Sequence, residues 1–418
     1  MVKFNLSKIK HNRIYIIIII MSFIVYGNGI NNEYSMDDNL VTQGVAKVEK
    51  GVSGIKEILT TRYAEGKQSY DYRPLVQITF ALEKQLFNKL PDKQTITEKK
   101  RKDRLTQANI SHFVNIVIYA LLCIVLFSFL SEVFNEYNVL LPLTITLLFL
   151  VHPLHTEPIN NIKSRDELLM LLMILLSLKS YVKFAITNRI KYLIFGVLFV
   201  FLGMLCKKNA MAILGLVPVV LYFRGISLKK ILISTASVLG IIFMFLLMKK
   251  GVITTPSSRE IKFFENPLVF EGTFIDRITV GLYSSWFYLK MLIFPKDLSF
   301  YYGYNQIPMA DWSFWEVWAS LLFYLALGVY GVFQLVKRNV LGLGIVIWIG
   351  VMLGVINVFF PIVGIVADRF AFTFSIGFCI VLGYLLLKLF KVDLTKEVYK
   401  TNLPNGFLVV LISILFVH

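Results

Sequence analysis

The stretch that decides the fold is short and polar: His152–Glu157 reads HPLHTE, and Lys163–Glu167 follows it with KSRDE. Apolar runs flank this polar stretch, with Val139–Val151 before it and Leu168–Leu178 after it. Charged groups next to hydrocarbon are costly, so polar clusters at the edge of membrane spans are functional candidates by default. The pattern predicts a membrane protein whose functional residues lie at a bilayer edge.

The composition agrees with this interpretation and excludes a soluble domain. Of 418 residues, 56% are hydrophobic and only 17% are charged, and the apolar runs repeat along the chain. A spanning helix needs about 20 mostly apolar residues. The predicted fold class is therefore an all-α polytopic membrane protein with 11–12 apolar segments. These segments are Ile14–Tyr26, Phe113–Ser131, Val139–Val151, Leu168–Tyr181, Tyr192–Cys206, Ala210–Phe223, Ile231–Met248, Ile278–Phe294, Phe314–Val336, Val340–Phe360, Phe370–Leu389 and Gly406–Val417.

The formal charge of +17 indicates membrane topology and not nucleic-acid binding, because much of it flanks the spans. Lys3, Lys8, Lys10 and Arg13 precede the first span and predict a cytoplasmic N-terminus. Further cytoplasmic clusters are predicted at Lys183/Arg189/Lys191, Arg224/Lys229/Lys230, Lys337/Arg338 and Lys388/Lys391/Lys396. Full crossing by Ile278–Phe294 would place Lys337/Arg338 outside, so we interpret that segment as re-entrant or interfacial.

Three regions follow from this pattern. Residues 1–28 form the first span, interpreted as an uncleaved anchor because no small-x-small cleavage site follows it. Residues 29–111 form an extracytoplasmic loop with two amphipathic helices, predicted from apolar stripes over Val41–Leu59 and Leu75–Leu86. Residues 112–418 form the polytopic region. Low Ala with high Lys, Ile, Asn and Phe suggests a bacterial source, and hence the inner (cytoplasmic) membrane.

Two aspartates, Asp37 and Asp38, lie just beyond the first span. One interpretation is a base that deprotonates a hydroxyl nucleophile, or a pair that holds a metal. The alternative is helix capping, in which Asp38 or Asn39 satisfies free backbone N–H groups. A divalent cation such as Mg²⁺ or Mn²⁺ stays open, and no other cofactor is predicted.

Five cations are predicted at the outer ends of helices, where they could hold a phosphate: Arg73, Arg165, Lys207, Lys208 and Arg369. Guanidinium forks suit phosphate, and these cations outnumber the carboxylates expected beside them. Structural alternatives exist for each. Ser164 and Glu167 have the spacing of a capping box, the paired lysines could snorkel, and Arg369 could pair with Asp368.

His152, His155 and Glu157 are predicted to bind substrate hydroxyls or phosphate. A zinc site uses the same residue types, but Pro153 argues against one helix presenting both histidines. A plain polar turn between two spans is the structural alternative.

The order of these motifs resembles the transmembrane and tetratricopeptide-repeat O-mannosyltransferases, which are C-type (GT-C) glycosyltransferases. The residues that carry the resemblance are Asp37-Asp38, Tyr72-Arg73-Pro74-Leu75, Ser111–Asn115, the HPLHTE loop, Ser164–Leu169, Leu205–Lys208, Asn266-Pro267, Asp276-Arg277 and Asp368–Phe378. The likeness runs from about Tyr34 to Gly383.

The resemblance implies a polytopic enzyme that takes a sugar from a polyprenyl-phosphate carrier on the outer face, with Asp37-Asp38 at the catalytic position. The acceptor would be a Ser/Thr hydroxyl of an exported protein, or an envelope glycan. This chain departs from the family at Cys206-Lys207-Lys208, where Ser-Lys-Glu is usual, and at Asp368-Arg369, where Glu-Arg is usual. The family's repeats do not appear, so this member lacks them or the chain is incomplete.

Two other functions compete with transfer. A transporter or lipid flippase would carry polar residues at mid-membrane depth, whereas here the charges cluster at span ends. An inactive GT-C-like scaffold would keep the fold without the chemistry, and Lys208 is the departure that favours it.

Overall fold

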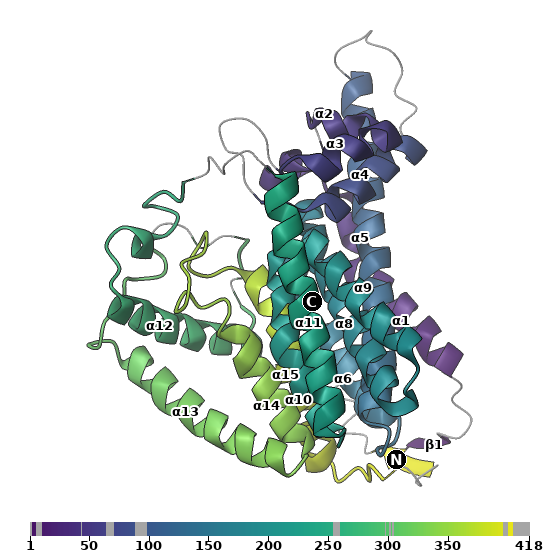
Figure 1. Ribbon diagram of the computed structural model, residues 1–418, viewed down its shortest axis with the longest axis vertical. Coiled ribbons are helices and arrows are strands. Elements are labelled where there is room, and N and C mark those ends of the chain that lie inside the picture. The colour runs from purple at the N-terminus through teal and green to yellow at the C-terminus, as the bar shows by residue number, and fades with distance from the viewer. Residues whose placement is uncertain are drawn as a thin grey trace.

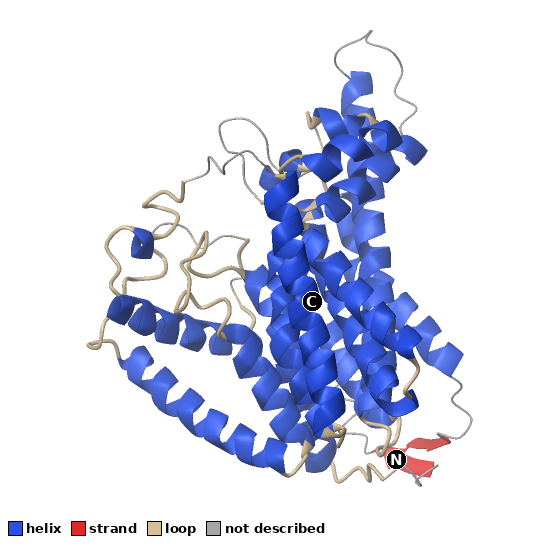
Figure 2. Ribbon diagram, viewed as in Figure 1, coloured by secondary structure: helices blue, strands red, loops and turns tan. Residues whose placement is uncertain are grey.

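The computed structural model describes residues 2–5, 11–42, 44–63, 71–87, 98–253, 260–296, 298–300, 302, 305–395 and 400–403. Within these ranges every predicted apolar segment contains a helix, and the predicted segment Gly406–Val417 lies outside them. The predicted all-α polytopic membrane fold is confirmed. A small antiparallel ribbon, β1 (Val2–Asn5) with β2 (Lys400–Leu403), accompanies the helices (Figure 2).

Most helices form one bundle, and several of them run along the long axis of the molecule (Figure 1). Among the described residues, six helices are long and apolar enough to cross a membrane, and a bent helix pair after residue 139 raises this to seven. The bundle consists of α1 (His11–Tyr26), α5 (Glu98–Val133), α6 (Leu140–Leu150), α8 (Arg165–Thr187), α9 (Ile190–Cys206), α10 (Ile213–Phe223), α11 (Leu228–Val252), α14 (Val340–Met352) and α15 (Asp368–Leu389).

Two further helices stand to one side of the bundle. Figure 1 shows α12 (Phe274–Ile293) lying across the direction of α8 and α11, while α13 (Trp315–Val336) slants back toward the start of α14. α12 does not qualify as a spanning helix, whereas α13 does. This arrangement favours the interfacial interpretation of Ile278–Phe294.

Basic residues gather at one end of the bundle. Lys183 Nζ lies 3.4 Å from the Glu132 carboxylate, and Arg224 donates to the Val133 carbonyl at 3.4 Å. The guanidinium of Arg338 lies over the Tyr222 ring, 5.7 Å from its centroid. Three of the predicted cytoplasmic clusters, at the ends of α8, α10 and α13, therefore lie at the same end of the bundle as the end of α5. The positive-inside pattern predicts such a gathering.

The opposite end is covered by short helices of the first loop (Figure 1). The second stripe forms one helix, α4 (Pro74–Phe87), as predicted. The first stripe does not: it is divided into α2 (Ala46–Glu49), η4 (Gly51–Gly54) and α3 (Ile55–Thr60). Gly51 has a φ of 61°, which ends regular helix there. Val41, Val48 and Ile58 of the first stripe are buried in the core. Leu82 and Leu86 of the second stripe are 40% and 73% exposed, and α4 packs on the core through Val76, Phe80 and Ala81 instead.

Small residues allow α14 and α15 to cross closely. A Cβ on Gly377 would lie 2.6 Å from the Gly344 carbonyl oxygen and 2.7 Å from the Trp348 Cα. Helices in membranes associate through such close backbone approach at small residues. This contact sets the position of α15, whose first residues enter the site described below.

We expect Gly377→Ala to lower the free energy of unfolding by about 1–3 kcal/mol, because the added methyl has no space and the helices must separate. The measurement is thermal unfolding of the purified protein in detergent. Gly350→Ala on α14 is the matched control, since its Cβ would meet nothing within 4 Å. Equal stability of both variants would show that the α14–α15 crossing tolerates a larger separation.

Candidate active site

The HPLHTE stretch turns the chain at the end of the bundle away from the basic clusters. It forms η6 (Pro153–His155), α7 (Thr156–Asn160) and η7 (Ile162–Ser164) between α6 and α8. α6 and the segment Pro153–Asn160 are bent by 56° relative to each other. Pro153 occupies the first position of η6, which suits a residue without an N–H group.

The two aspartates occupy η3 (Met36–Leu40), which lies against η7. Asp38 is fully buried. It accepts backbone N–H bonds from Ser35 at 2.8 Å and from Lys163 at 2.8 Å. Burial raises the pKa of Asp38, and the hydrogen bonds from Ser35 and Lys163 act in the opposite direction. Asp38 therefore joins two segments of the chain, with a capping box at Ser35 as its local part.

Asp37 is placed differently from its neighbour. Its side chain is 35% exposed, and its Oδ2 accepts from Lys163 Nζ at 2.9 Å. Lys163 belongs to the quoted polar stretch, but its residue type alone did not distinguish it from a solvated lysine. It positions the accessible member of the acidic pair.

A buried group of ion pairs lies beside η7, at the start of α8. Lys207 pairs with Glu167, and its Nζ lies 3.7 Å from Asp166 Oδ1. Arg73 pairs with both Asp166 and Asp71. Two consecutive carboxylates are thus neutralised by cations from two other segments. Glu167 is engaged by Lys207, and Ser164 makes no capping bond, so the capping box predicted for Ser164 and Glu167 is wrong.

Lys208 differs from Lys207. It begins η8 (Lys208–Ala212), is exposed, and makes no hydrogen bond or ion pair within the part of the chain that the structure describes. The charge of Lys208 acts on Asp71 in the loop before α4. Burial alone would raise the pKa of Asp71, but the positive charges of Arg73 and Lys208 outweigh burial and lower this pKa.

A cavity of about 370 Å³ opens next to these groups. Ligand pockets typically measure about 300–1,000 Å³. Its walls come from four segments far apart in the sequence: Ser35, Thr156, Glu157, Asn160, Asn161, Leu298, Ser299, Phe300 and Asp368. Glu157 is 7% exposed and accepts from the Ser164 hydroxyl at 3.1 Å through Oε1. Its Oε2 has no hydrogen-bond partner.

Arg369 and Asp368 begin α15 at the edge of this cavity. Arg369 donates to the Phe300 carbonyl at 3.1 Å and lies 3.5 Å from Glu157 Oε1. Asp368 accepts from the Tyr302 hydroxyl at 2.8 Å. The predicted local pair of Asp368 with Arg369 is therefore replaced by separate partners for each residue. Both tie α15 to the segment that follows α12.

The predicted excess of cations does not occur in the structure. Arg73, Lys207 and Arg369 each have a carboxylate partner, and so does Arg165 with Glu83. The carboxylate partners come from segments distant in sequence, so these ion pairs could not be predicted from neighbouring residues. Lys208 alone of the five predicted cations has no ion pair among the described residues.

The histidines do not face the cavity. The ring of His155 is fully buried, with Nδ1 3.1 Å from the Tyr119 hydroxyl and Nε2 2.9 Å from the Ser375 hydroxyl. His152 has Nε2 3.1 Å from the Leu292 carbonyl, and Nδ1 accepts from the Leu154 N–H. Both side chains use their ring nitrogens to join helices. Their predicted role in substrate binding stays a prediction.

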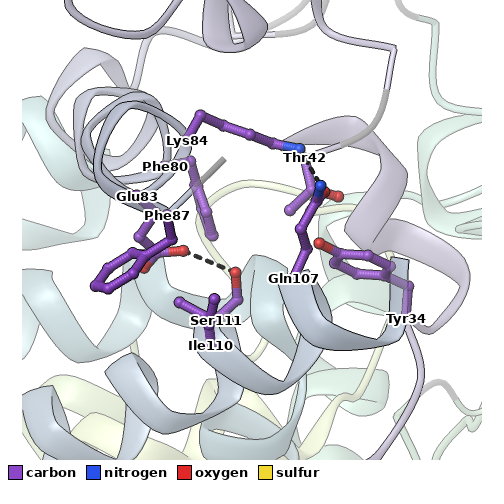
Figure 3. Close-up of a pocket in the computed structure, with 9 residues that line it drawn as sticks. All are labelled: Tyr34, Thr42, Phe80, Glu83, Lys84, Phe87, Gln107, Ile110 and Ser111. Carbon is purple, nitrogen blue, oxygen red and sulfur yellow. Dashed lines mark hydrogen bonds between the residues drawn. The ribbon is translucent and has the colours of Figure 1, made fainter. Parts of the chain in front are cut away.

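Arg165 is also enclosed by protein. It is fully buried, donates to Asn115 Oδ1 at 2.7 Å and pairs with Glu83 at 2.5 Å. Its guanidinium lies over the Phe80 ring, 3.9 Å from the centroid. The hydrogen bonds of Glu83 to Ser111 and of Lys84 to Gln107 join α4 to α5 (Figure 3). Arg165 joins α4 to the bundle through these contacts, and its contact with a phosphate stays a prediction.

The small cavity in Figure 3 is not a candidate site. It lies between α4 and α5 and measures about 20 Å³, enough for about one water molecule. Within the described ranges, no group of three His, Cys, Asp or Glu side chains is arranged to hold a metal ion.

No protein-family model matches the chain. Several curated proteins do. The chain is 24% identical over 382 residues to the protein O-mannosyl-transferase F38B6.6 of Caenorhabditis elegans, covering 90% of this chain. The homologues of this chain are protein O-mannosyl-transferases of the TMTC family. Mouse TMTC3 is 23% identical over 360 residues, and human TMTC4 is 28% identical over 279 residues, covering 78% and 57% of this chain.

The chain spans about half the length, or less, of these curated relatives. The matched part is 51% of the worm protein, 36% of mouse TMTC3 and 37% of human TMTC4. The match to the worm protein covers 90% of this chain and therefore includes the central polar stretch His152–Glu167.

We expect Arg165→Met to lower the free energy of unfolding by about 3–5 kcal/mol, because it leaves the Glu83 carboxylate, which is only 12% exposed, without its cation. Thermal unfolding in detergent measures this loss. The double variant Arg165→Met/Glu83→Leu removes both charges and should recover much of the stability. A stable single variant whose donor kinetics are impaired would instead return Arg165 to the substrate site.

Proposed function

We propose that the chain is a glycosyltransferase that moves a hexose, mannose by analogy with its homologues, from a polyprenyl-phosphate carrier to an acceptor hydroxyl. The acceptor is a protein Ser or Thr, or an envelope glycan. The observation that carries the proposal is the cavity of about 370 Å³ lined by Ser35, Glu157 and Asp368, in a chain whose homologues are named O-mannosyl-transferases. Asp37 follows Ser35 by two residues, and Arg369 follows Asp368 and contacts Glu157.

The reaction is a displacement at the anomeric carbon of the donor sugar. Asp37 takes the proton of the acceptor hydroxyl, and the acceptor oxygen forms a bond to the anomeric carbon. The bond between that carbon and the phosphate oxygen breaks, and its electron pair leaves with the lipid phosphate. Arg369 and Lys208 stabilise the charge that develops on the phosphate.

Asp37 suits the role of base better than Asp38. A base must reach the acceptor, and Asp37 is 35% exposed whereas Asp38 is buried and holds two backbone N–H groups. Ser35, two residues earlier, lines the cavity. Lys163 holds Asp37 in one orientation through its contact of 2.9 Å with Oδ2.

The site is proposed to face the extracytoplasmic side, and the N-terminus the cytoplasm. Basic clusters gather at the opposite end of the bundle. Because basic residues are enriched on the cytoplasmic side of membrane proteins, this supports an extracytoplasmic site. Clustering of charges at one end also favours transfer over transport. Localisation in a bacterial inner membrane stays a prediction from composition, and the relatives named above are animal proteins.

We expect Asp37→Asn to lose transfer by roughly 100-fold or more, which is the usual contribution of a positioned base. Its thermal stability should match that of the unchanged protein. The measurement is sugar transfer by the purified protein in liposomes.

Asp38→Asn is the matched comparison. An amide at this position cannot accept equally from both backbone N–H groups, so this variant should lose stability. Asp37→Asn with most of its activity retained would exclude Asp37 as the base. Failure of the unchanged chain to transfer sugar would instead favour an inactive scaffold.

The donor is predicted to be lipid-linked, because nucleotide sugars are scarce outside the cytoplasm. Purified protein should therefore turn over polyprenyl-phosphate mannose and ignore GDP-mannose. Lys208→Glu should raise the KM for the lipid-linked donor, since it reverses the charge of the accessible cation. A preference for the nucleotide sugar would overturn this assignment.

A further inference from the structure

Four of the five tryptophans of the chain gather where α12 meets α13. Trp286 and Trp315 have ring centroids 5.3 Å apart, and Trp312 and Trp318 have ring centroids 5.1 Å apart. We call these four residues the tryptophan corner. The fifth, Trp348, is 4% exposed and lies in the core between other helices.

The corner is open on the outside of the molecule. Trp312, Trp315 and Trp318 are 41%, 62% and 48% exposed. The indole N–H of Trp318 donates to the Trp312 carbonyl at 2.9 Å, which fixes the two rings together. Exposed indoles held in place are unusual for a water-facing surface and typical of the membrane interface, where an apolar ring meets polar headgroups.

The dimensions of α13 locate this interface. The helix has 22 residues, which corresponds to about 33 Å of length against a hydrocarbon core of about 30 Å. Leu322, Leu325 and Val329 on its surface are 65%, 62% and 66% exposed, as expected for contact with lipid. Lys337 follows one end of the helix, and the tryptophan corner lies at the other.

The corner is connected to the candidate site. Trp286 lies on α12, and the neighbouring Phe287 packs edge-on against Tyr302, with ring centroids 5.0 Å apart. Tyr302 in turn binds Asp368. The segment Leu298–Phe300, between α12 and Tyr302, forms one wall of the cavity, and Phe300 binds Arg369.

We propose that the tryptophan corner docks into the headgroup layer of the bilayer and thereby holds α12 and the cavity wall Leu298–Phe300 at the membrane surface. The occupant of this exposed face is the lipid bilayer, because the face continues without a break into the lipid-facing surface of α13. The wall of the site is positioned by the bilayer as well as by the protein.

The first test uses the native fluorescence of the full chain in liposomes. Nitroxide lipids labelled near the headgroup should quench tryptophan emission roughly twofold more than lipids labelled deep in the acyl chain, because interfacial indoles lie at headgroup depth. Stronger quenching by the deep label would overturn the proposal. Absence of quenching by either label would also overturn it, because the face would then be covered by protein.

The second test asks whether the corner positions the wall. Cysteines replace Ser299 and Asn160, which lie on different walls of the cavity, and carry spin labels whose separation is measured. The native cysteines Cys123, Cys206 and Cys379 are buried, so labelling is selective. In liposomes, Trp312→Ala/Trp315→Ala/Trp318→Ala should broaden the distance distribution.

The control variant changes the same helix outside the corner: Leu322→Ala/Leu325→Ala/Val329→Ala should leave the distribution unchanged. Equal distributions for both triple variants would overturn the link between corner and wall. Triple Trp→Phe substitution should keep the distribution narrow, because it retains an aromatic interfacial anchor. Neither measurement depends on sugar transfer, so the outcome is independent of the proposed enzymatic function.

Discussion

Neutralisation of the carboxylates at the start of α8 is the constraint on which the site depends. Asp166 and Glu167 are each 2% exposed, and an uncompensated buried charge costs several kcal/mol or more. Their partners Lys207 and Arg73 come from the junction between α9 and η8 and from the loop before α4. These ion pairs therefore fix three segments at once and support η7, which holds the acidic pair.

The helices could be predicted from the sequence because the length of an apolar run is a local property. The divided first stripe of the outer loop could not, because the effect of Gly51 depends on its left-handed backbone. The role of Arg165 was also inaccessible, since Asn115 and Glu83 are remote in sequence. The same holds for His155, whose partners are Tyr119 and Ser375.

The candidate site shows the same contrast between local sequence properties, which can be predicted, and contacts between remote residues, which cannot. The sequence placed Asp37, Glu157 and Arg369 correctly at the end of the bundle, because each lies at the boundary of an apolar run. It did not predict that the cations would already be paired. Under the proposed function, an incoming lipid phosphate exchanges partners with Glu157 at Arg369, or binds first at Lys208. A site closer to charge balance than to a preformed anion hole would then favour release of that phosphate after transfer.

The bridge that Asp38 forms between η3 and η7 has a consequence for evolution. Two adjacent residues of the same type experience different selection. Asp38 is needed for folding in any relative that keeps this loop arrangement, whether or not it transfers sugar. Asp37 makes one ion pair, with Lys163, and under the proposed function its main constraint is the chemistry. If Asp37 is the base proposed above, a lineage that lost the reaction would retain the second aspartate and drift at the first. This position in a descendant sequence would then report whether the ancestral chemistry has survived.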